Sequence, residues 1–264
     1  MTTLPPILRD KHHAARSAFT PESLLREARR QKRVPDAPIP DICVLDPDGD
    51  IVRHLRATNR ARRVEGWACY HSEMLAFDQG GHTYGIVGCA VGASYAVLLA
   101  EQMFVSGCQL LVSITSSGQI TPLGPPPYFI LIDRALRDEG TSYHYLPPAC
   151  YAHADPALVA AIAPGLSRAG ERVERGDTWT TDAPYRETDA AIEAARGQGI
   201  LAVEMEAAAL YAFAEAKRKP VLCFAHVTNQ MGREGDFEKG EANGAVASLA
   251  LVAAVAEKWD RSRR

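Results

Sequence analysis

Several patterns that would assign a function directly are missing from this sequence of 264 residues. None of its six cysteines forms a CxxC pair, and most stand in apolar runs. This pattern predicts reduced, buried thiols and excludes a disulfide framework or a zinc site. No uncharged apolar stretch is long enough to span a membrane, and the N-terminus has no apolar signal core. We therefore expect a cytoplasmic protein without a metal centre.

Charge and glycine patterns exclude two further classes of protein. The net charge is −3, so there is no general attraction to nucleic acid or to an anionic membrane. Residues 88–94 contain glycine but no GxGxxG, which excludes a dinucleotide-binding fingerprint. A hydrophobic content of 47% with 23% charged residues is typical of a globular chain with a sizeable core. The sequence is therefore compatible with a globular protein that acts on a small molecule.

Residues 1–40 are predicted to be an N-terminal helical extension and linker. Thr20 is a good helix cap and Pro21 suits the first helical position, so we expect a helix to about Lys32 with a strongly basic face. The prolines at 35, 38 and 40 then predict an extended linker. Residues 41–264 alternate strand and helix patterns, with about seven strands, which predicts one α/β domain.

Polar clusters follow several of the predicted strands. In α/β sheets, ligands bind beyond the carboxyl ends of strands, so clusters at several such ends imply a shared pocket. The four clusters are Gly49–Arg53, Thr115–Gly118, Glu204–Glu206 and Thr228–Gln230.

The stretch Glu204-Met205-Glu206 lies between an apolar run at 200–203 and an alanine-rich helix pattern. The two carboxylates share a face if the strand continues through them, and diverge if the helix has begun. A carboxylate near helix N–H groups stays ionised and can accept hydrogen bonds from two hydroxyls. A vicinal diol such as that of ribose is a natural partner. The alternative is an ordinary first-turn helix residue.

Other segments offer an anion site and a site for a planar ring. Gly49 in a turn, with Arg53 one helical turn later, can hold an anion, although an Asp-Gly turn is also a common connector. The hydroxyls of 115–117 suit an anion or simply a Ser/Thr turn. The aromatic loop 179–186 could stack a planar ring. His144 suits either a base or a structural histidine.

In this order and at these separations, the motifs resemble those of the nucleoside phosphorylase and nucleosidase superfamily, of the hexameric purine nucleoside phosphorylase and uridine phosphorylase type. The resemblance covers roughly residues 41–257 and is strongest in the run Val203-Glu204-Met205-Glu206-Ala207-Ala208. It implies a single α/β domain in three layers, with a mixed, twisted central β-sheet flanked by helices. It also implies a homo-oligomer built from dimers, up to a hexamer.

The resemblance further implies residue roles. Glu206 would bind the ribose 2′- and 3′-hydroxyls, with Met205 packed on the sugar and Glu204 in support. A histidine near the N-terminus, here His12 or His13, would reach a neighbouring subunit's 5′-hydroxyl. The remaining expected roles are phosphate binding by Gly49, Arg53, Thr115 and Ser116, base binding by Gly118, Trp179, Thr181 and Tyr185, and catalysis through hydrogen bonds to the leaving base by Asn229 and Arg186.

Two positions depart from the family pattern. Phosphorolytic members carry an arginine three residues before the phosphate-binding hydroxyl, where this chain has Ser113. Purine-specific bacterial members carry an acid where this chain has Asn229, and an amide cannot supply a proton by ionisation. Uridine-type members also lack that acid.

The expected activity is therefore a nucleoside phosphorylase, a pentosyltransferase of uridine-like or broad specificity. It would use inorganic phosphate as co-substrate and no cofactor. Two alternatives stay open: a nucleosidase that uses water, which Ser113 supports, and a nucleoside-binding protein without turnover. The preferred base is not readable from the loop at 179–186.

Overall fold

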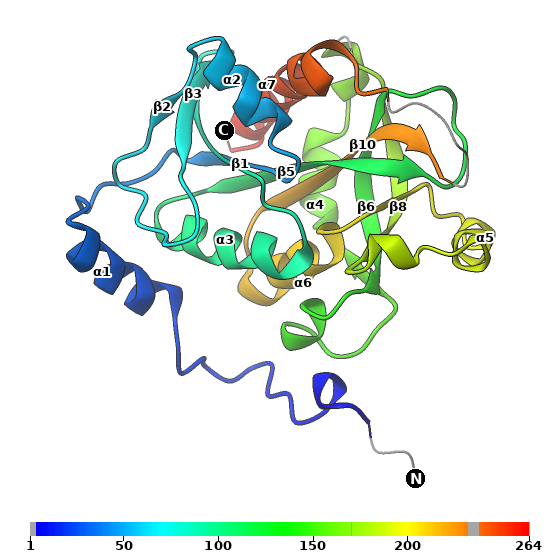
Figure 1. Cartoon of the computed structure of the whole chain (residues 1–264), viewed down its shortest axis with the longest axis horizontal. Coiled ribbons are helices and arrows are strands. Elements are labelled where there is room, and N and C mark those ends of the chain that lie inside the picture. The colour runs from blue at the N-terminus through cyan, green and yellow to red at the C-terminus, as the bar shows by residue number, and fades with distance from the viewer. Residues whose placement is uncertain (1–3, 170, 232–237, 264) are drawn as a thin grey trace.

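The computed structural model describes residues 4–169, 171–231 and 238–263. These residues form a mixed ten-stranded sheet with helices on both sides (Figure 1). The expected single α/β domain with a mixed sheet is confirmed. The strands are β1 (Ile42–Asp46), β2 (Arg62–Arg63), β3 (Leu75–Gln79), β4 (His82–Gly88), β5 (Leu110–Gln119), β6 (Tyr128–Asp138), β7 (Tyr151–His153), β8 (Val173–Thr181), β9 (Ala202–Glu204) and β10 (Val221–Gln230).

The helices form two groups. α3 packs against α6 and α1 on one side, and α2 and α4 pack against α7 on the other. The α-helices are α1 (Pro21–Lys32), α2 (Asp50–Ala57), α3 (Ala93–Val105), α4 (Pro156–Ile162), α5 (Asp189–Gly197), α6 (Ala207–Lys217) and α7 (Ala245–Ser262). Short 3-10 helices lie at Pro6–Leu8, Ser142–His144, Leu166–Ala169, Pro184–Arg186 and Glu241–Gly244.

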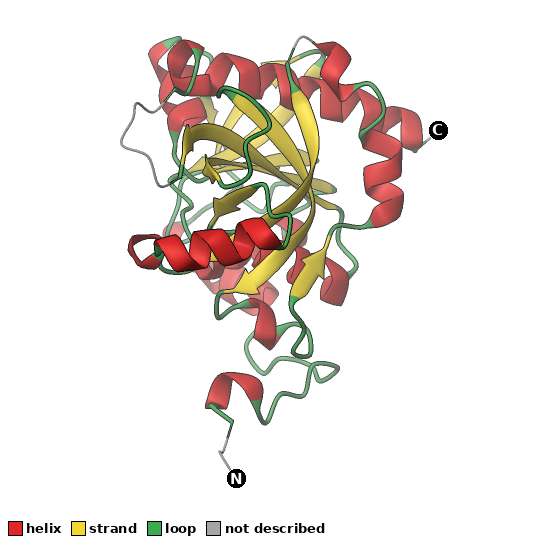
Figure 2. Cartoon of the chain, turned by 90° about the vertical axis from the view of Figure 1, so that its right-hand side faces the viewer, coloured by secondary structure: helices red, strands yellow, loops and turns green. Residues whose placement is uncertain are grey.

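Part of the sheet closes on itself, which the sequence did not predict. The strand order is β10-β6-β8-β9-β5-β1-β4-β3-β2, and β10 also pairs with β5. The five strands β5, β10, β6, β8 and β9 therefore form a closed ring, and Figure 2 shows these strongly curved strands surrounded by helices. Closure removes the sheet edge on this side.

β5 connects this ring to the open part of the sheet. Its first half, Leu110 to Ser113, pairs in parallel with Ile42 to Leu45 of β1, and its last two residues pair with β9. Because β1 and β5 run in parallel, the loop after β1 lies beside the second half of β5. The fold thus brings the segments near 48 and 116 together.

The helix starts follow from local side chains. Thr20 caps α1 by accepting the N–H of Ser23 at 3.3 Å, as predicted, and Leu25 and Ala28 of this helix are buried against Ala68. The basic helix of the extension is therefore packed on the domain. Gly49 precedes α2 with φ +76°, a conformation that glycine adopts without strain.

Some expected element boundaries were wrong. The sequence pattern favours paired strands at 66–77 and 83–89 around a Gly80-Gly81 turn, but residues 66–74 are not part of a strand and the pairing begins at Leu75. The cluster Thr115–Gly118 and the cluster Thr228–Gln230 lie within β5 and β10 instead of following them, because the closed ring extends the pairing of both strands. The short strands β2 and β7 were not expected.

Two expectations drawn from composition can be compared with the structure. Four cysteines are buried, at 43, 69, 108 and 223, whereas Cys89 and Cys150 are exposed, so burial was wrong for these two. Within the described ranges, none of the helices combines the length and apolar character that crossing a membrane requires.

Candidate functional site

The loop between β1 and α2 is held by a buried aspartate. The Asp46 carboxylate accepts the N–H groups of Gly49 at 3.1 Å and Val52 at 2.9 Å, and burial raises its pKa to about 7. A Cβ on Gly49 would lie 2.7 Å from Cys89 Sγ and 2.9 Å from Arg53 Nη1. The loop therefore needs glycine at this position, both for its φ angle and for space.

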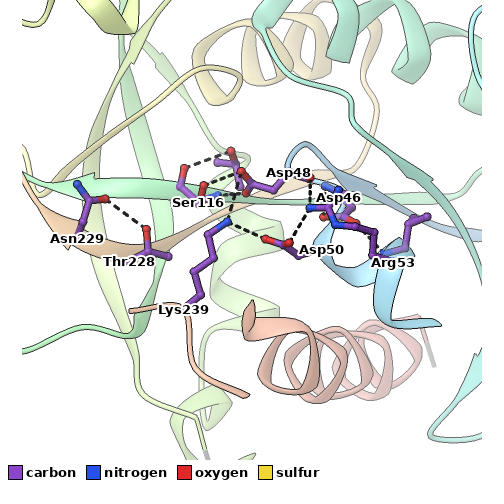
Figure 3. Close-up of polar contacts among 11 residues, drawn as sticks. Asp46, Asp48, Asp50, Arg53, Ser116, Thr228, Asn229 and Lys239 are labelled. Atoms are coloured by element: carbon purple, nitrogen blue, oxygen red, sulfur yellow. Dashed lines mark hydrogen bonds and ion pairs between the residues drawn. The ribbon is translucent and has the colours of Figure 1, made fainter. Parts of the chain in front are cut away.

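Arg53 is turned toward its own loop. Its Nη2 donates to the Asp48 carbonyl oxygen at 2.7 Å and to Asp50 Oδ1 at 2.6 Å, while 59% of its side chain is exposed (Figure 3). The guanidinium therefore keeps free donors toward solvent. The assignment of Gly49 and Arg53 to phosphate stays a prediction.

Asp48 takes both anion-binding donors of Ser116. Its Oδ2 accepts the Ser116 N–H at 2.8 Å and its Oδ1 accepts the Ser116 hydroxyl at 2.7 Å. Lys239 Nζ lies 3.9 Å from Asp48 Oδ1 and 2.7 Å from Asp50 Oδ2, so a lysine joins the two carboxylates (Figure 3). The groups expected to bind phosphate thus already face a carboxylate of this chain.

The two glutamates of the central motif diverge, because β9 ends at Glu204. Glu204 Oε2 accepts the N–H groups of Glu206 and Ala207, both at 2.7 Å, and its Oε1 accepts the hydroxyls of Thr178 and Thr180. Every acceptor oxygen of Glu204 is therefore used to fix the start of α6. This geometry is that of a supporting carboxylate.

Glu206 points the other way and keeps one oxygen free. Its side chain is 1% exposed, Oε1 accepts the Gly92 N–H at 2.6 Å, and Oε2 has no hydrogen-bond partner among the described residues. Burial, followed by the charge of Glu204, raises its pKa to about 8, and the hydrogen bond from the Gly92 N–H lowers it in part. A buried acceptor without a partner calls for a ligand hydroxyl or a water.

The expected sugar ligand, Glu206, lies close to Asp48, which stands where phosphate was expected to bind. The charge of Asp48 contributes to the raised pKa of Glu206, so the two carboxylates are near neighbours. Ser113, at the position where the family arginine was expected, is 1% exposed, and its hydroxyl has no partner in the described part of the chain. The environment of Glu206 is therefore polar, buried and short of cations.

The expected base-binding residues are placed unevenly. Gly118 and Asn229 are paired neighbours on β5 and β10. A Cβ on Gly118 would lie 2.1 Å from Met231 Sδ, so this methionine covers the glycine, and Asn229 Nδ2 lies 3.8 Å from the same sulfur. This pair is thus beside Ser116 on the same two strands. Their role in base binding stays a prediction.

The residues expected at 179–186 are divided between the end of β8 and the loop after it, so only part of this segment is a loop. Trp179 is buried in a small core cluster against which Met231 also packs, and it donates to Asp138 Oδ2 at 3.0 Å. The Thr181 hydroxyl accepts the Ala183 N–H. Tyr185 is 99% exposed, and Arg186 is exposed as well. The roles of these four residues at the base stay predictions.

The histidines considered from the sequence lie against one another at the N-terminal segment. Lys11 Nζ is 3.2 Å from His144 Nδ1, and His13 Nε2 is 3.2 Å from the Tyr143 carbonyl oxygen. Burial, with Lys11 second, lowers the pKa of His144. His144 thus contacts the N-terminal segment, and its role stays a prediction.

Sequence reasoning missed three residues of the site. Asp48 was read only as part of a turn, although the run Asp46-Pro47-Asp48 after a strand could have marked it. Gly92 supplies the N–H to Glu206 from the segment 88–94, which was considered from the sequence only as a dinucleotide-binding fingerprint. Lys239 gave no signal, because its partners are almost 190 positions away along the chain.

A sequence model of the phosphorylase superfamily matches residues 41–257. The chain belongs to the phosphorylase superfamily. Members of this superfamily act on nucleosides as phosphorylases or hydrolases. The match begins at β1 and ends within α7, so the extension with α1 lies outside it.

Two solved structures of this superfamily share the fold. A uridine phosphorylase from Vibrio fischeri, solved with 6-hydroxy-1-naphthoic acid, aligns at TM-score 0.67 and 19% identity, over 89% of this chain and 94% of that one. A Campylobacter jejuni 5′-methylthioadenosine/S-adenosyl homocysteine nucleosidase aligns at TM-score 0.68 and 16% identity, over 83% of this chain and 99% of that one. At these identities the likeness shows the fold alone, and the fold serves both reaction types.

Proposed function

We propose that this phosphorylase-superfamily chain cleaves the N-glycosidic bond of a ribonucleoside and transfers the ribosyl group to water. The sugar side of this proposal is supported by Glu206, whose Oε2 is buried and has no hydrogen-bond partner among the described residues. A ribose diol would supply the hydrogen bonds that this oxygen lacks. Met205, the neighbour of Glu206 in the chain and partly buried, is expected to pack on the sugar.

The choice of water rests on one observation, the double hydrogen bond from Ser116 to Asp48. A phosphate ion needs these donors, and here a carboxylate holds them. Asp46 and Asp50 flank the loop that contains Asp48, and Ser113 adds no positive charge. An incoming phosphate would meet like charges at short range, which is unfavourable in a partly buried site.

The same carboxylate suits the activation of water. Asp48 is 30% exposed on its side chain and has lone pairs beyond those that Ser116 uses. The water oxygen would bond to C1′ as the bond from C1′ to the base nitrogen breaks, and the water proton would pass to Asp48. The charge of Asp48 would stabilise the positive charge that develops on the ribosyl ring.

The leaving base takes the electron pair of the broken bond. Asn229 can donate a hydrogen bond to this base but has no ionisable proton to give. Bases that leave as delocalised anions, such as uracil, therefore suit the site best, which keeps the uridine-like or broad specificity expected from the sequence. Arg186 would join Asn229 only if its loop moved inward.

Phosphorolysis is the second candidate, and one observation favours it. The Arg53 guanidinium is 59% exposed at the start of α2, beside Gly49, where an anion could bind. In this case phosphate would displace Asp48 from Ser116, and Thr115 and Ser116 would act as expected from the sequence. The product would be ribose 1-phosphate.

We also propose a homo-oligomer, as the family resemblance implied. Val91, just before α3, is 52% exposed beside Gly92, and Leu98 is exposed on α3. Exposed apolar side chains next to the site fit a surface that a second subunit covers. Sedimentation of the purified chain would show a single species larger than a monomer.

A nucleoside panel assayed with and without phosphate tests the proposed reaction. We expect release of free base from a ribonucleoside in phosphate-free buffer, with no rise in rate when phosphate is added. Base release that requires phosphate would establish the second candidate. Binding of nucleosides without any base release would instead identify a nucleoside-binding protein.

A further inference from the structure

A continuous series of hydrogen bonds and ion pairs lies on the side of the site where the ribosyl acceptor would bind. It begins at Ser116, passes through Asp48 to Lys239, and continues through Asp50 to Arg53. Lys239 is the link between the two carboxylates: its Nζ lies 2.7 Å from Asp50 Oδ2 and 3.9 Å from Asp48 Oδ1 (Figure 3). The position of Asp48 thus depends on a residue from the far end of the sequence.

The main chain around Lys239 is itself held in place. The Glu238 N–H donates to the Thr228 carbonyl oxygen of β10 at 2.8 Å, and the Gly240 N–H donates to Glu238 Oε1 at 2.7 Å. The Lys239 side chain is 24% exposed, so its ammonium is partly shielded from solvent. The lysine is therefore a fixed bridge from the end of β10 to the loop after β1.

The ammonium of Lys239 faces an excess of carboxylates around Asp48. Arg53, the other cation of the loop, is engaged by Asp50 Oδ1. Burial, with the charge of Lys239 second, lowers the pKa of His226 to about 4, so this imidazole is neutral at pH 7. The titratable and charged groups that face Asp48 are Asp46 from β1, Asp50 and Arg53 from α2, Glu206 before α6, His226 from β10 and Lys239.

We propose that Lys239 is a positioning residue that holds the Asp48 carboxylate toward Ser116, where it can take the proton of the attacking water. The inference rests on the proposed function, because it assigns Asp48 as the base. Lys239 acts through Asp48 and Asp50, its two ion-pair partners. Removing its charge would leave the Asp48 carboxylate beside like charges without this cation, so that its position for proton transfer is lost.

The test compares Lys239→Met with Lys239→Arg, and uses Lys217→Met on the exposed end of α6 as the matched control. For Lys239→Met we expect kcat to fall at least about tenfold, since proton transfer by a positioned base contributes roughly 10²–10⁴-fold. KM should stay within about twofold, Lys239→Arg should recover most of the rate, and Lys217→Met should match the parent protein.

Three results would overturn the inference. One is an unchanged kcat in Lys239→Met; another is a raised KM with kcat unmoved, which would make the lysine a substrate ligand. The third is an equal loss in the Met and Arg variants together with a lower melting temperature, which would make it structural. If Lys239→Met expresses poorly, Lys239→Gln carries the same test.

Asp48→Asn distinguishes failure of this inference from failure of the proposed function. Loss of turnover in Asp48→Asn with an unchanged kcat in Lys239→Met would defeat the role of Lys239 alone. Full turnover in Asp48→Asn would defeat the assignment of Asp48 as the base and, with it, the water mechanism.

Discussion

The carboxylate of Asp48 accepts both the main-chain N–H and the hydroxyl of Ser116, at 2.8 and 2.7 Å. The two residues are 68 positions apart and meet because β1 and β5 are parallel neighbours. These two donors suit a bound anion such as phosphate, and here the Asp48 carboxylate occupies them. This contact carries the proposal that water is the ribosyl acceptor.

Asp48→Asn should abolish most of the turnover. The amide keeps the shape of the side chain but cannot take a proton, so we expect kcat for base release in phosphate-free buffer to fall roughly 100-fold or more. KM should change little, because the sugar is held by Glu206. Asp78→Asn, which alters an exposed carboxylate paired with Arg62, is the control and should keep the parent rate. A kcat unchanged in Asp48→Asn would contradict the assigned base.

Glu206→Ala should remove recognition of the diol. Hydrogen bonds to a charged group contribute about 1.5–3 kcal/mol, so we expect kcat/KM for a ribonucleoside to fall about 10- to 100-fold. The variant should also lose the preference of the parent protein for a ribonucleoside over its 2′-deoxy analogue. Steady-state rates on both substrates give this ratio, with the exposed Glu215→Ala as control. An unaltered preference would mean that another residue reads the 2′-hydroxyl.

The stability of the protein should depend on pH through Glu206. Its pKa is about 8 in the folded protein and 4.5 as the reference for an exposed glutamate, so the folded state binds the proton more tightly. Its contribution to the free energy of unfolding is therefore complete below about pH 4.5 and is lost as pH rises toward 8. Glu206→Gln stays neutral throughout, so we expect it to melt higher than the parent protein at pH 8 but not at pH 4.5.

The contribution of His226 to the pH dependence of stability has the opposite sign, but it is the same in the parent protein and in Glu206→Gln. Its pKa is lowered to about 4, so its contribution is present above about 6.5 and is lost as pH falls toward 4. Both proteins contain this histidine. A difference in melting temperature that is equal at pH 4.5 and pH 8 would show that Glu206 is not the titrating group.

Glu204 should matter for stability more than for binding. Glu204→Leu leaves the N–H groups of Glu206 and Ala207 without an acceptor in a buried site, so we expect the free energy of unfolding to fall by about 2–4 kcal/mol. Glu204→Gln keeps an oxygen for these donors and should restore most of the loss. Urea unfolding of both variants measures the difference. Equal stability in the Leu variant and the parent protein would rule out the capping role.

The sequence pointed to Glu206, which the structure leaves with a free buried oxygen, but not to the contacts made by Asp48. Glu206 was identified because a strand end, a helix start and a carboxylate coincide within a few residues. The contact of Asp48 with Ser116 could not be predicted, because it depends on the register of β1 and β5 and on side chains that compete for the same donors. Lys239 depends on contacts across the whole fold and left no local pattern.

The extent of the strands was the main error in the predicted fold. Thr115 to Gly118 looked like a turn because hydroxyl residues and glycine favour turns, yet they continue β5 through pairing with β10 and β9. Tertiary pairing here overrides local preference. The same closure of the ring buries Trp179, which looked from the sequence like part of an exposed aromatic loop.

The identity of the sugar product tests the central claim most directly. The purified chain would be incubated with a cleaved ribonucleoside in excess inorganic phosphate, and the products would be separated and identified by mass spectrometry. The proposed function predicts free ribose at a rate that phosphate does not alter. Ribose 1-phosphate as the main product would contradict it, and would show that phosphate displaces Asp48 from Ser116.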